Sequence, residues 1–412
     1  MMDIRLYTRM LEIDSTSGRE RTLADFLADR LLTSHNRVER FDVESMAGDV
    51  PEGCGIPQNL LFSWGTPKVI FCTHLDTVPP YIPPCVFEEG ASDEVDIQMA
   101  GQDVECRVGK IAGRGTCDAK GQIFAMWEAC RALEERGYTD FGLLLLAGEE
   151  TGSFGAKAFN SVISTPSSSP VISTPSSVPV ISSEVEISPD AWVIVGEPTD
   201  NCMATAEKGT KSYDVTFSGK SCHSGYPELG ASAIMYFNDF VNALRSIVFP
   251  VDEVLGETTW NIGDLVSANP QNILSDRLTC RIYFRTTFES DEMVRNIMKN
   301  IAGPDARLRF GRPAVQDGSD IVAKSVAPWQ EAMSVNLRGG DAPTRFEVLD
   351  GFPVKAVAFG SDAPVLKCFR HRILCGPGSI HVAHRPDEHI NIEDIETAVQ
   401  NYIKMAQRIL EQ

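Results

Sequence analysis

The stretch that decides the fold is residues 69–76, Val-Ile-Phe-Cys-Thr-His-Leu-Asp. Apolar, β-favouring residues run directly into a His-x-Asp pair, and the Thr-Val-Pro-Pro that follows prevents a helix from continuing there. The pattern predicts a buried strand that ends by presenting His74 and Asp76. In an open α/β sheet, ligands bind at the carboxyl ends of the strands, so this end is a candidate site. Asp76 could hydrogen-bond His74 from behind and fix its tautomer, although a chance pair in a loop is the alternative.

Two more apolar segments have the same design. Residues 143–147 lead into Glu149 and Glu150, and residues 191–195 lead into Glu197. Segments that are apolar throughout are typical of strands buried on both faces of a parallel sheet. Because parallel strands end at one edge, we expect these carboxylates to lie close to His74.

A glycine-rich segment, residues 113–121, presents Asp118 on a turn just ahead of a helix. An apolar stripe within residues 123–133 predicts that helix, and Gly137 is its stop signal. The segment lacks the Gly-Lys-Ser/Thr ending of a phosphate loop, and a carboxylate stands where backbone amides would face a phosphate. We therefore interpret Asp118 as a potential ligand rather than as part of a nucleotide site.

Size and composition exclude several classes of protein. A chain of 412 residues allows two or three domains, and 43% hydrophobic with 23% charged residues is typical of a globular protein. A formal charge of −20 without a basic block argues against nucleic-acid partners, because like charges repel. The N-terminus mixes charges, and no apolar run approaches the roughly 20 residues that span a bilayer. Eleven cysteines lack a disulfide-like spacing, so we expect buried free thiols and a cytoplasmic protein without membrane partners.

Residues 208–311 differ from the rest of the chain in the pattern of their hydrophobic residues. Their patterns predict strands near 213–217, 259–262, 278–284 and 308–310 and helices near 234–244 and 293–301, with further helices outside them at 22–32 and 395–410. The order β-α-β-β-α-β is the ferredoxin-like plan, so we expect a domain inserted in an α/β body of residues 1–207 and 312–412. Residues 161–189, where Val-Ile-Ser recurs at 162, 171 and 180, are expected to be a disordered insertion in that body.

The strand ends and loops collect many potential metal ligands. They are His74, Asp76, Asp118, Glu149, Glu150, Glu197 and one of His381, His384 or His389. So many carboxylates cannot all be ionised in one cleft without cations. Imidazole and carboxylate ligands suit zinc or another borderline divalent ion, and two ions would need about five protein ligands, one of them bridging.

Together these motifs resemble the co-catalytic zinc peptidase and deacetylase family. The resemblance rests on His74-x-Asp76, residues 113–121, Glu149-Glu150, residues 196–199 and Ala383-His384. The family includes acetylornithine deacetylase, succinyl-diaminopimelate desuccinylase, carboxypeptidase G and aminoacylases, and the segment around His384 is most similar to the acetylornithine deacetylase branch. The resemblance implies a zinc-peptidase-like α/β catalytic domain with an inserted ferredoxin-like lid or dimerisation domain.

The resemblance also implies a role for each ligand. One zinc would be held by His74, Asp118 and Glu197, and the other by Asp118, Glu150 and His384, so that Asp118 bridges the two. Asp76 would orient His74, and Glu149 would be the general base that takes a proton from the water and returns it to the leaving amine. Cobalt or manganese could replace zinc.

In residues 208–311, His223 resembles the family's histidine that stabilises the tetrahedral oxyanion, usually from the partner subunit. A histidine that caps a turn is the alternative. Asn272 and Arg285 resemble substrate-binding residues, with Arg285 as a bidentate partner for a carboxylate. The resemblance therefore implies a homodimer through residues 208–311.

The activity implied is metal-dependent deacylation of an N-acyl amino acid, as by the acetylornithine deacetylases of arginine biosynthesis. A desuccinylase, a dipeptidase or a carboxypeptidase would keep the same metals and differ in the charge of the substrate pocket. A catalytically idle relative would be expected to lack the base or the oxyanion histidine, whereas Glu149 and His223 are both present.

Overall fold

The computed structural model describes residues 2–48, 50–88, 108–164, 186–304, 306–307 and 326–411. The chain divides into two compact units. The first contains Met1–Thr205, Phe346–Lys355 and Ser361–Gln412, and the second contains Ala206–Arg345 and Ala356–Gly360. Each unit has its own sheet and its own hydrophobic core.

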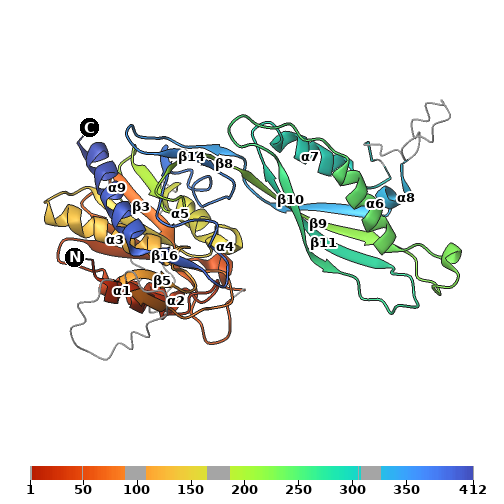
Figure 1. Ribbon diagram of the computed structural model, residues 1–412, viewed down its shortest axis with the longest axis horizontal. Helices are drawn as coiled ribbons and strands as arrows, with labels where there is room; N and C mark the ends of the chain where they lie inside the picture. The colour runs from red at the N-terminus through yellow and green to blue at the C-terminus, as the bar shows by residue number, and fades with distance from the viewer. Residues whose placement is uncertain are drawn as a thin grey trace, which may run out of the picture. The chain divides into compact units, whose positions relative to one another are not determined.

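A six-stranded mixed sheet forms the centre of the first unit (Figure 1). Its strand order is β1-β2-β6-β3-β7-β15, and the last four of these strands run parallel. The strands are β1 Arg37–Asp42, β2 Gln58–Trp64, β6 Phe141–Leu146, β3 Val69–His74, β7 Trp192–Val195 and β15 His371–Leu374. β3 and β6 are buried along their whole length, as their apolar sequences predict.

Helices pack on this sheet and complete the first core. They are α1 Ile4–Leu11, α2 Arg21–Arg30, α3 Lys120–Glu135, α4 Glu149–Gly152, α5 Phe154–Ser164 and α9 Ile392–Leu410, with a 3-10 turn, η1, at Glu44–Met46. Figure 1 shows α3 beside α9, and Met126 of α3 and Tyr402 of α9 join one core with Phe71 of β3. The helices predicted at 22–32, 123–133 and 395–410 are confirmed, whereas α1, β1 and β2 have no counterpart among the predicted elements. Cys72 and Cys130 are buried free thiols.

A smaller sheet in the first unit positions a loop. Its order is β16-β5-β4, from His389–Asn391, Val108–Ala112 and Cys85–Glu88. Antiparallel pairing sets His389 of β16 opposite Ala112 of β5. The residues just before β16 therefore lie beside the glycine-rich loop that follows β5.

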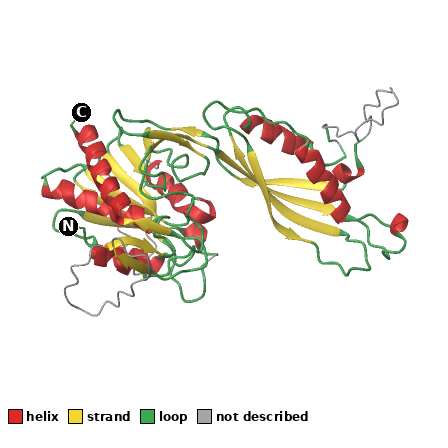
Figure 2. Ribbon diagram, in the orientation of Figure 1, coloured by secondary structure: helices red, strands yellow, loops and turns green. Residues whose placement is uncertain are grey.

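The second unit has the ferredoxin-like architecture that the sequence predicts. Strands β9 Gly209–Ser218, β10 Thr259–Val266, β11 Arg277–Thr286 and β12 Met333–Gly339 form an antiparallel sheet of order β10-β11-β9-β12. Helices α6 Ala233–Arg245 and α7 Asp291–Asn300 lie on one face of this sheet (Figure 2). The short elements η2 Pro227–Leu229 and α8 Pro328–Glu331 complete the unit. Phe217, Phe240 and Ile297 are among the residues that fill the core between sheet and helices.

The return of the chain to the catalytic body was predicted too early. Residues from 312 were expected in that body, but Met333–Gly339 pairs with β9 and extends the sheet of the second unit. The final strand expected at 308–310 lies outside the described residues. β12 occupies the fourth strand position of the ferredoxin-like order.

The insertion predicted at 161–189 starts later than expected, because the residues up to Ser164 continue helix α5. Residues 165–185 lie outside the described part of the chain.

A short sheet of order β13-β8-β14 is formed by Thr344–Arg345, Met203–Glu207 and Val354–Val357. Among the helices that the structure describes, none is both long enough and apolar enough to cross a membrane.

Candidate metal centre

Three neighbouring parallel strands end at the same edge of the large sheet. Parallel pairing sets His74 of β3 opposite Leu146 of β6, and β7 flanks β3 on its other side. Glu149 and Glu150 follow β6, and Glu197 follows β7. The convergence of strand ends that the sequence predicts is therefore present in the fold.

Asp118 reaches this edge from the loop between β5 and α3. That loop is organised by Glu388, a fully buried residue just ahead of β16. One carboxylate oxygen of Glu388 accepts hydrogen bonds from the backbone amides of Gly115, Cys117 and Asp118 at 2.9–3.1 Å. The other oxygen pairs with the buried Arg114. The position of Asp118 thus depends on a carboxylate 270 residues away in sequence.

Asp118 lies between two histidines. Its Oδ1 is 2.9 Å from Nε2 of His74, and its Oδ2 is 3.2 Å from Nε2 of His384. The same nitrogen of His384 is 3.0 Å from Oε1 of Glu150. One ligand atom each from His74, Asp118 and Glu150 lies within 4.8 Å of the other two. A carboxylate that turns one oxygen to each of two imidazoles is placed to bridge two cations.

The backbone of Asp76, rather than its side chain, makes the short contact with His74. Nδ1 of His74 is 2.9 Å from the carbonyl oxygen of Asp76 and 3.5 Å from its Oδ1. Because a carbonyl can only accept, Nδ1 donates and Nε2 is the atom presented to a cation. The Asp76 carboxylate accepts the backbone amides of Glu149 and Glu150 at 3.0 and 3.1 Å. The Asp76 side chain thus fixes the start of α4 and the direction of both glutamates, in addition to the role behind His74 that the sequence predicts for it.

Glu197 is buried, and the residues after it fix its place. Oγ1 of Thr199 accepts a hydrogen bond from the amide of Gly376, and Thr199 also bridges to Ser379. These contacts join the end of β7 to the segment after β15, which leads to His384. Among the described residues, none hydrogen-bonds the Glu197 carboxylate, so its oxygens are available to a ligand.

The ionisable groups of the centre influence one another strongly. Burial raises the pKa of Glu197 well above its usual value, and the Asp118 carboxylate adds to the rise. Burial also raises the pKa of Glu149, with Glu197 contributing. The hydrogen bond to Asp118 raises the pKa of His384 to about 10. The centre gathers more carboxylates than its histidines can neutralise, which favours a bound cation.

The donor set fits a divalent metal pair. His74, Asp118, Glu150, Glu197 and His384 offer imidazole nitrogens and carboxylate oxygens, a combination that suits zinc, cobalt or manganese. Cys117 is the nearest thiol in sequence, but its Sγ contacts the carbonyl oxygen of Ser379 at 3.4 Å. The sequence interpretation of Cys117 as a bystander is consistent with this contact.

Three predicted site residues belong to the second unit. His223 is exposed, and its Nδ1 accepts a hydrogen bond from the amide of Gly225 at 3.1 Å. A backbone bridge between His223 and Ile273 places Asn272 beside this histidine. Arg285 lies near the end of β11, on a separate strand of the unit. The structure therefore brings His223 and Asn272 together.

Asp362 is a buried acid in residues 360–363, a segment whose sequence also resembles a substrate-side loop of the family. Its side chain is 2% exposed, and its Oδ1 has no hydrogen-bond partner among the described residues. Burial raises its pKa to about 6, while a hydrogen bond with Ser153 and interaction with His74 oppose the rise. Its negative charge also contributes to the raised pKa values of Glu149 and Glu197.

Glu388→Ala is expected to destabilise the first unit and to weaken metal binding. The change leaves Arg114 buried without its partner and frees three loop amides, so the free energy of unfolding should fall by roughly 3–5 kcal/mol. Urea unfolding measures this loss. The control is Asp387→Ala at the exposed neighbour, which should leave the free energy of unfolding close to that of the wild type. Equal stability of the two variants would contradict the role given to Glu388.

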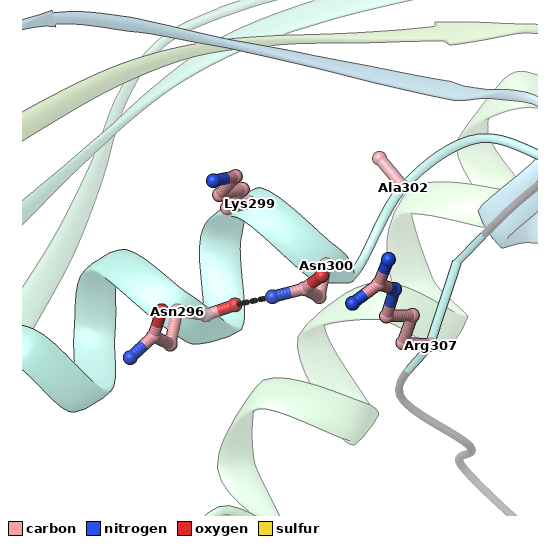
Figure 3. A pocket seen from close by; sticks show the side chains of 5 residues that line it. All are labelled: Asn296, Lys299, Asn300, Ala302 and Arg307. Atoms are coloured by element: carbon pink, nitrogen blue, oxygen red, sulfur yellow. Dashed lines mark hydrogen bonds between the residues drawn. The ribbon is translucent and has the colours of Figure 1, made fainter.

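A hollow of about 400 Å³ in the second unit is unrelated to this chemistry. It lies at the end of α7 and is lined by Asn296, Lys299, Asn300, Ala302 and Arg307 (Figure 3). Figure 3 shows two basic side chains and two amides there, with neither an imidazole nor a carboxylate. Such a lining does not hold a divalent cation.

Comparison with known proteins identifies the family. The model described as "Peptidase family M20/M25/M40" matches residues 70–408. A probable carboxypeptidase of Emericella nidulans is 30% identical over 99% of this chain and 89% of its own length. A probable carboxypeptidase of Aspergillus terreus is 29% identical over 96% of this chain and 84% of its own length. The chain belongs to peptidase family M20/M25/M40, and it is therefore a hydrolase of the metallopeptidase class.

Solved structures share the fold. A tripeptidase from Staphylococcus aureus superposes with a TM-score of 0.69 at 17% identity and covers 99% of this chain and 98% of that one. An M20 family metallo-carboxypeptidase from Sulfolobus solfataricus gives a TM-score of 0.64 at 13% identity and covers all of both chains. The predicted fold class, a zinc-peptidase-like catalytic domain with a ferredoxin-like insertion, is confirmed.

Proposed function

We propose that this chain is a metal-dependent hydrolase that cleaves a linear amide bond next to a free carboxylate, as a carboxypeptidase does. The observation that carries the proposal is Asp118, whose two oxygens each face an imidazole at the edge where Glu149 also lies. The names of the relatives support peptide substrates. Deacylation of an N-acyl amino acid, the activity implied by the sequence resemblance, is the second candidate, because it breaks the same kind of bond beside the same carboxylate.

Zinc is the metal we propose. His74, Asp118 and Glu197 would hold one ion, and Asp118, Glu150 and His384 the other. When bound, the metal pair would lower the pKa of the attacking water and polarise the carbonyl group of the scissile bond. The protein's own part is to hold these five side chains in place, through Glu388 behind Asp118 and through Asp76 behind Glu150.

Glu149 is the proposed general base. No described residue hydrogen-bonds its carboxylate, and burial raises its pKa, so it holds a proton more readily than an exposed glutamate. It would accept a proton from the attacking water and then donate that proton to the nitrogen of the leaving amine. Adjacent residues diverge at the start of α4, which allows Glu150 to bind metal while Glu149 faces the substrate.

His223 is proposed to stabilise the oxyanion from the partner subunit of a homodimer. The exposed apolar residues Tyr226, Leu229 and Met235, which follow it in the chain, support an interface on the second unit. Mixing Glu149→Ala with His223→Ala chains tests this role. With random exchange, half of the dimers would pair the two variants and carry one intact site, so roughly a quarter of wild-type activity should return. A fully active monomer would contradict the proposal.

Arg285 is proposed to bind the substrate carboxylate. Its guanidinium lies 4.9 Å from the ring centre of Tyr283, which steadies it, and a planar guanidinium can bind a carboxylate through two hydrogen bonds. Arg285→Ala should raise KM roughly 10- to 100-fold for substrates with a free carboxylate, because a charged hydrogen bond is lost. The control is Arg281→Ala on the same strand, whose side chain pairs with Asp214 and Asp264. A similar KM for both variants would contradict this assignment.

The proposed function is tested by amine release from zinc- or cobalt-loaded protein, with and without chelator. The substrates are an N-blocked dipeptide, the same dipeptide with an amidated C-terminus, N-acetyl-ornithine and N-succinyl-diaminopimelate. We expect chelator-sensitive cleavage of the dipeptide with the free carboxylate and little cleavage of its amide. Cleavage of N-acetyl-ornithine alone would favour the second candidate. No cleavage of any substrate by metal-loaded protein would contradict both.

A further inference from the structure

Residues 14–20, just ahead of α2, pair with the chain that follows β3, and the sequence analysis gave them no role. The Ser17 amide donates to the Thr77 carbonyl, and the Thr77 amide donates to the Ser15 carbonyl, each at 3.1 Å. Oδ1 of Asp14 accepts both the amide and the hydroxyl of Thr16 at 3.0 and 2.9 Å. These bonds hold the turn against the residues that immediately follow the His-x-Asp pair.

Ser17 contacts the buried Asp76 carboxylate directly. Its Oγ donates to Oδ2 of Asp76 at 2.9 Å, and the same oxygen accepts the Glu150 amide. The other oxygen accepts the Glu149 amide. Because Asp76 is fully buried, these protein donors set the orientation of its carboxylate.

We propose that Ser17 is a positioning residue of the hydrolytic centre, which acts through Asp76 on Glu149 and Glu150. Ser17 donates a hydrogen bond to Asp76, and Asp76 accepts the two amides that start α4. The catalytic consequence rests on the proposed function. If α4 is held less firmly, Glu149 moves relative to the attacking water. We therefore expect kcat to fall more than the affinity for substrate.

Two variants test the proposal. Ser17→Ala removes one donor to Asp76, and Ser17→Thr keeps the hydroxyl group. The control for Ser17→Ala is Ser63→Ala, because Ser63 is a buried serine that lies opposite Gly142 at the other end of β6.

Two readouts separate positioning from general stability. The first is the split between kcat and KM: Ser17→Ala should lower kcat roughly tenfold and leave KM within about threefold, while Ser17→Thr stays close to wild type. The second is amide hydrogen exchange, which needs neither metal nor substrate. Exchange in residues 148–153 should be roughly five- to tenfold faster in Ser17→Ala, because the acceptor of the Glu149 and Glu150 amides is less well held.

Unchanged exchange at residues 148–153 in Ser17→Ala would overturn the inference, whatever the activity. Unchanged kcat in an active enzyme would also overturn it. A Ser17→Thr protein as slow as Ser17→Ala, or an equal effect of Ser63→Ala, would overturn the role given to the Ser17 hydroxyl. Absence of hydrolysis in the wild type would instead count against the proposed function, and the exchange measurement would still decide the inference.

Discussion

Glu149→Ala is expected to lower kcat by about 10²- to 10⁴-fold while the protein keeps its bound metal. The side chain follows β6 at the edge where Asp118 stands between His74 and His384. No described residue hydrogen-bonds its carboxylate, and burial raises its pKa. The substitution therefore removes the group that moves the proton without removing a proposed metal ligand.

The matched control is Glu150→Ala, one residue further along α4. Oε1 of Glu150 is 3.0 Å from the same His384 nitrogen that faces Asp118, so this variant should lose metal as well as activity. Steady-state rates and metal content by mass spectrometry distinguish the two glutamates. Equal metal loss in both variants would show that the base has been assigned to the wrong residue.

His384→Ala is expected to weaken metal binding by more than about 100-fold, because it removes a proposed ligand rather than a supporting group. Nε2 of His384 contacts both Asp118 and Glu150, so its loss leaves two carboxylates without their shared partner. Competition with a chromogenic chelator measures the affinity. His384 has a pKa of about 10 in the metal-free protein, so binding must displace a proton and the affinity should rise with pH across the neutral range.

His381→Ala is the control for this prediction. His381 is exposed and lies in the same loop, and its sequence context does not separate it from His384 except through the family resemblance. We expect metal affinity in this variant to stay within about threefold of wild type, since no ligand is lost. Metal loss in His381→Ala with retention in His384→Ala would contradict the proposed ligand set.

The elements around the site could be predicted because their signals are local. The uninterrupted apolar runs of β3, β6 and β7 are buried as expected, and each leads into the acidic or imidazole side chain that the sequence shows. Parallel pairing then brings these ends to one edge without any further information. The prediction of Asp118 on a turn before α3 succeeded for the same reason, because a glycine-rich segment precedes a clear amphipathic stripe.

The groups that support the site could not be predicted, because they act over long sequence distances. Ser17 reaches Asp76 across 59 residues, and Glu388 reaches Asp118 across 270. A serine in a turn and an acid before a short strand have no local pattern that separates them from ordinary surface residues. The backbone carbonyl of Asp76 could not be predicted as a second partner of His74 for a different reason: it belongs to the same residue as the predicted carboxylate, and both lie near Nδ1.

Strand β12 could not be predicted either, because its pairing also joins residues that are far apart in the sequence. Its sequence, Met333–Gly339, has a short alternation, but its partner β9 lies more than a hundred residues earlier in the chain. Five of its seven residues are exposed, so the alternation of buried and exposed residues is weak. Only the missing fourth position in the ferredoxin-like order indicates that the second unit needs another strand after α7.

The most direct test of the account is anomalous X-ray diffraction from crystals of zinc-loaded protein, measured at the zinc absorption edge. The account predicts two peaks, one on each side of the Asp118 carboxylate, within bonding distance of His74 and Glu197 on one side and of Glu150 and His384 on the other. No peak at Asp118, with zinc bound elsewhere or absent at saturating concentration, would contradict the proposed centre and the hydrolytic mechanism built on it.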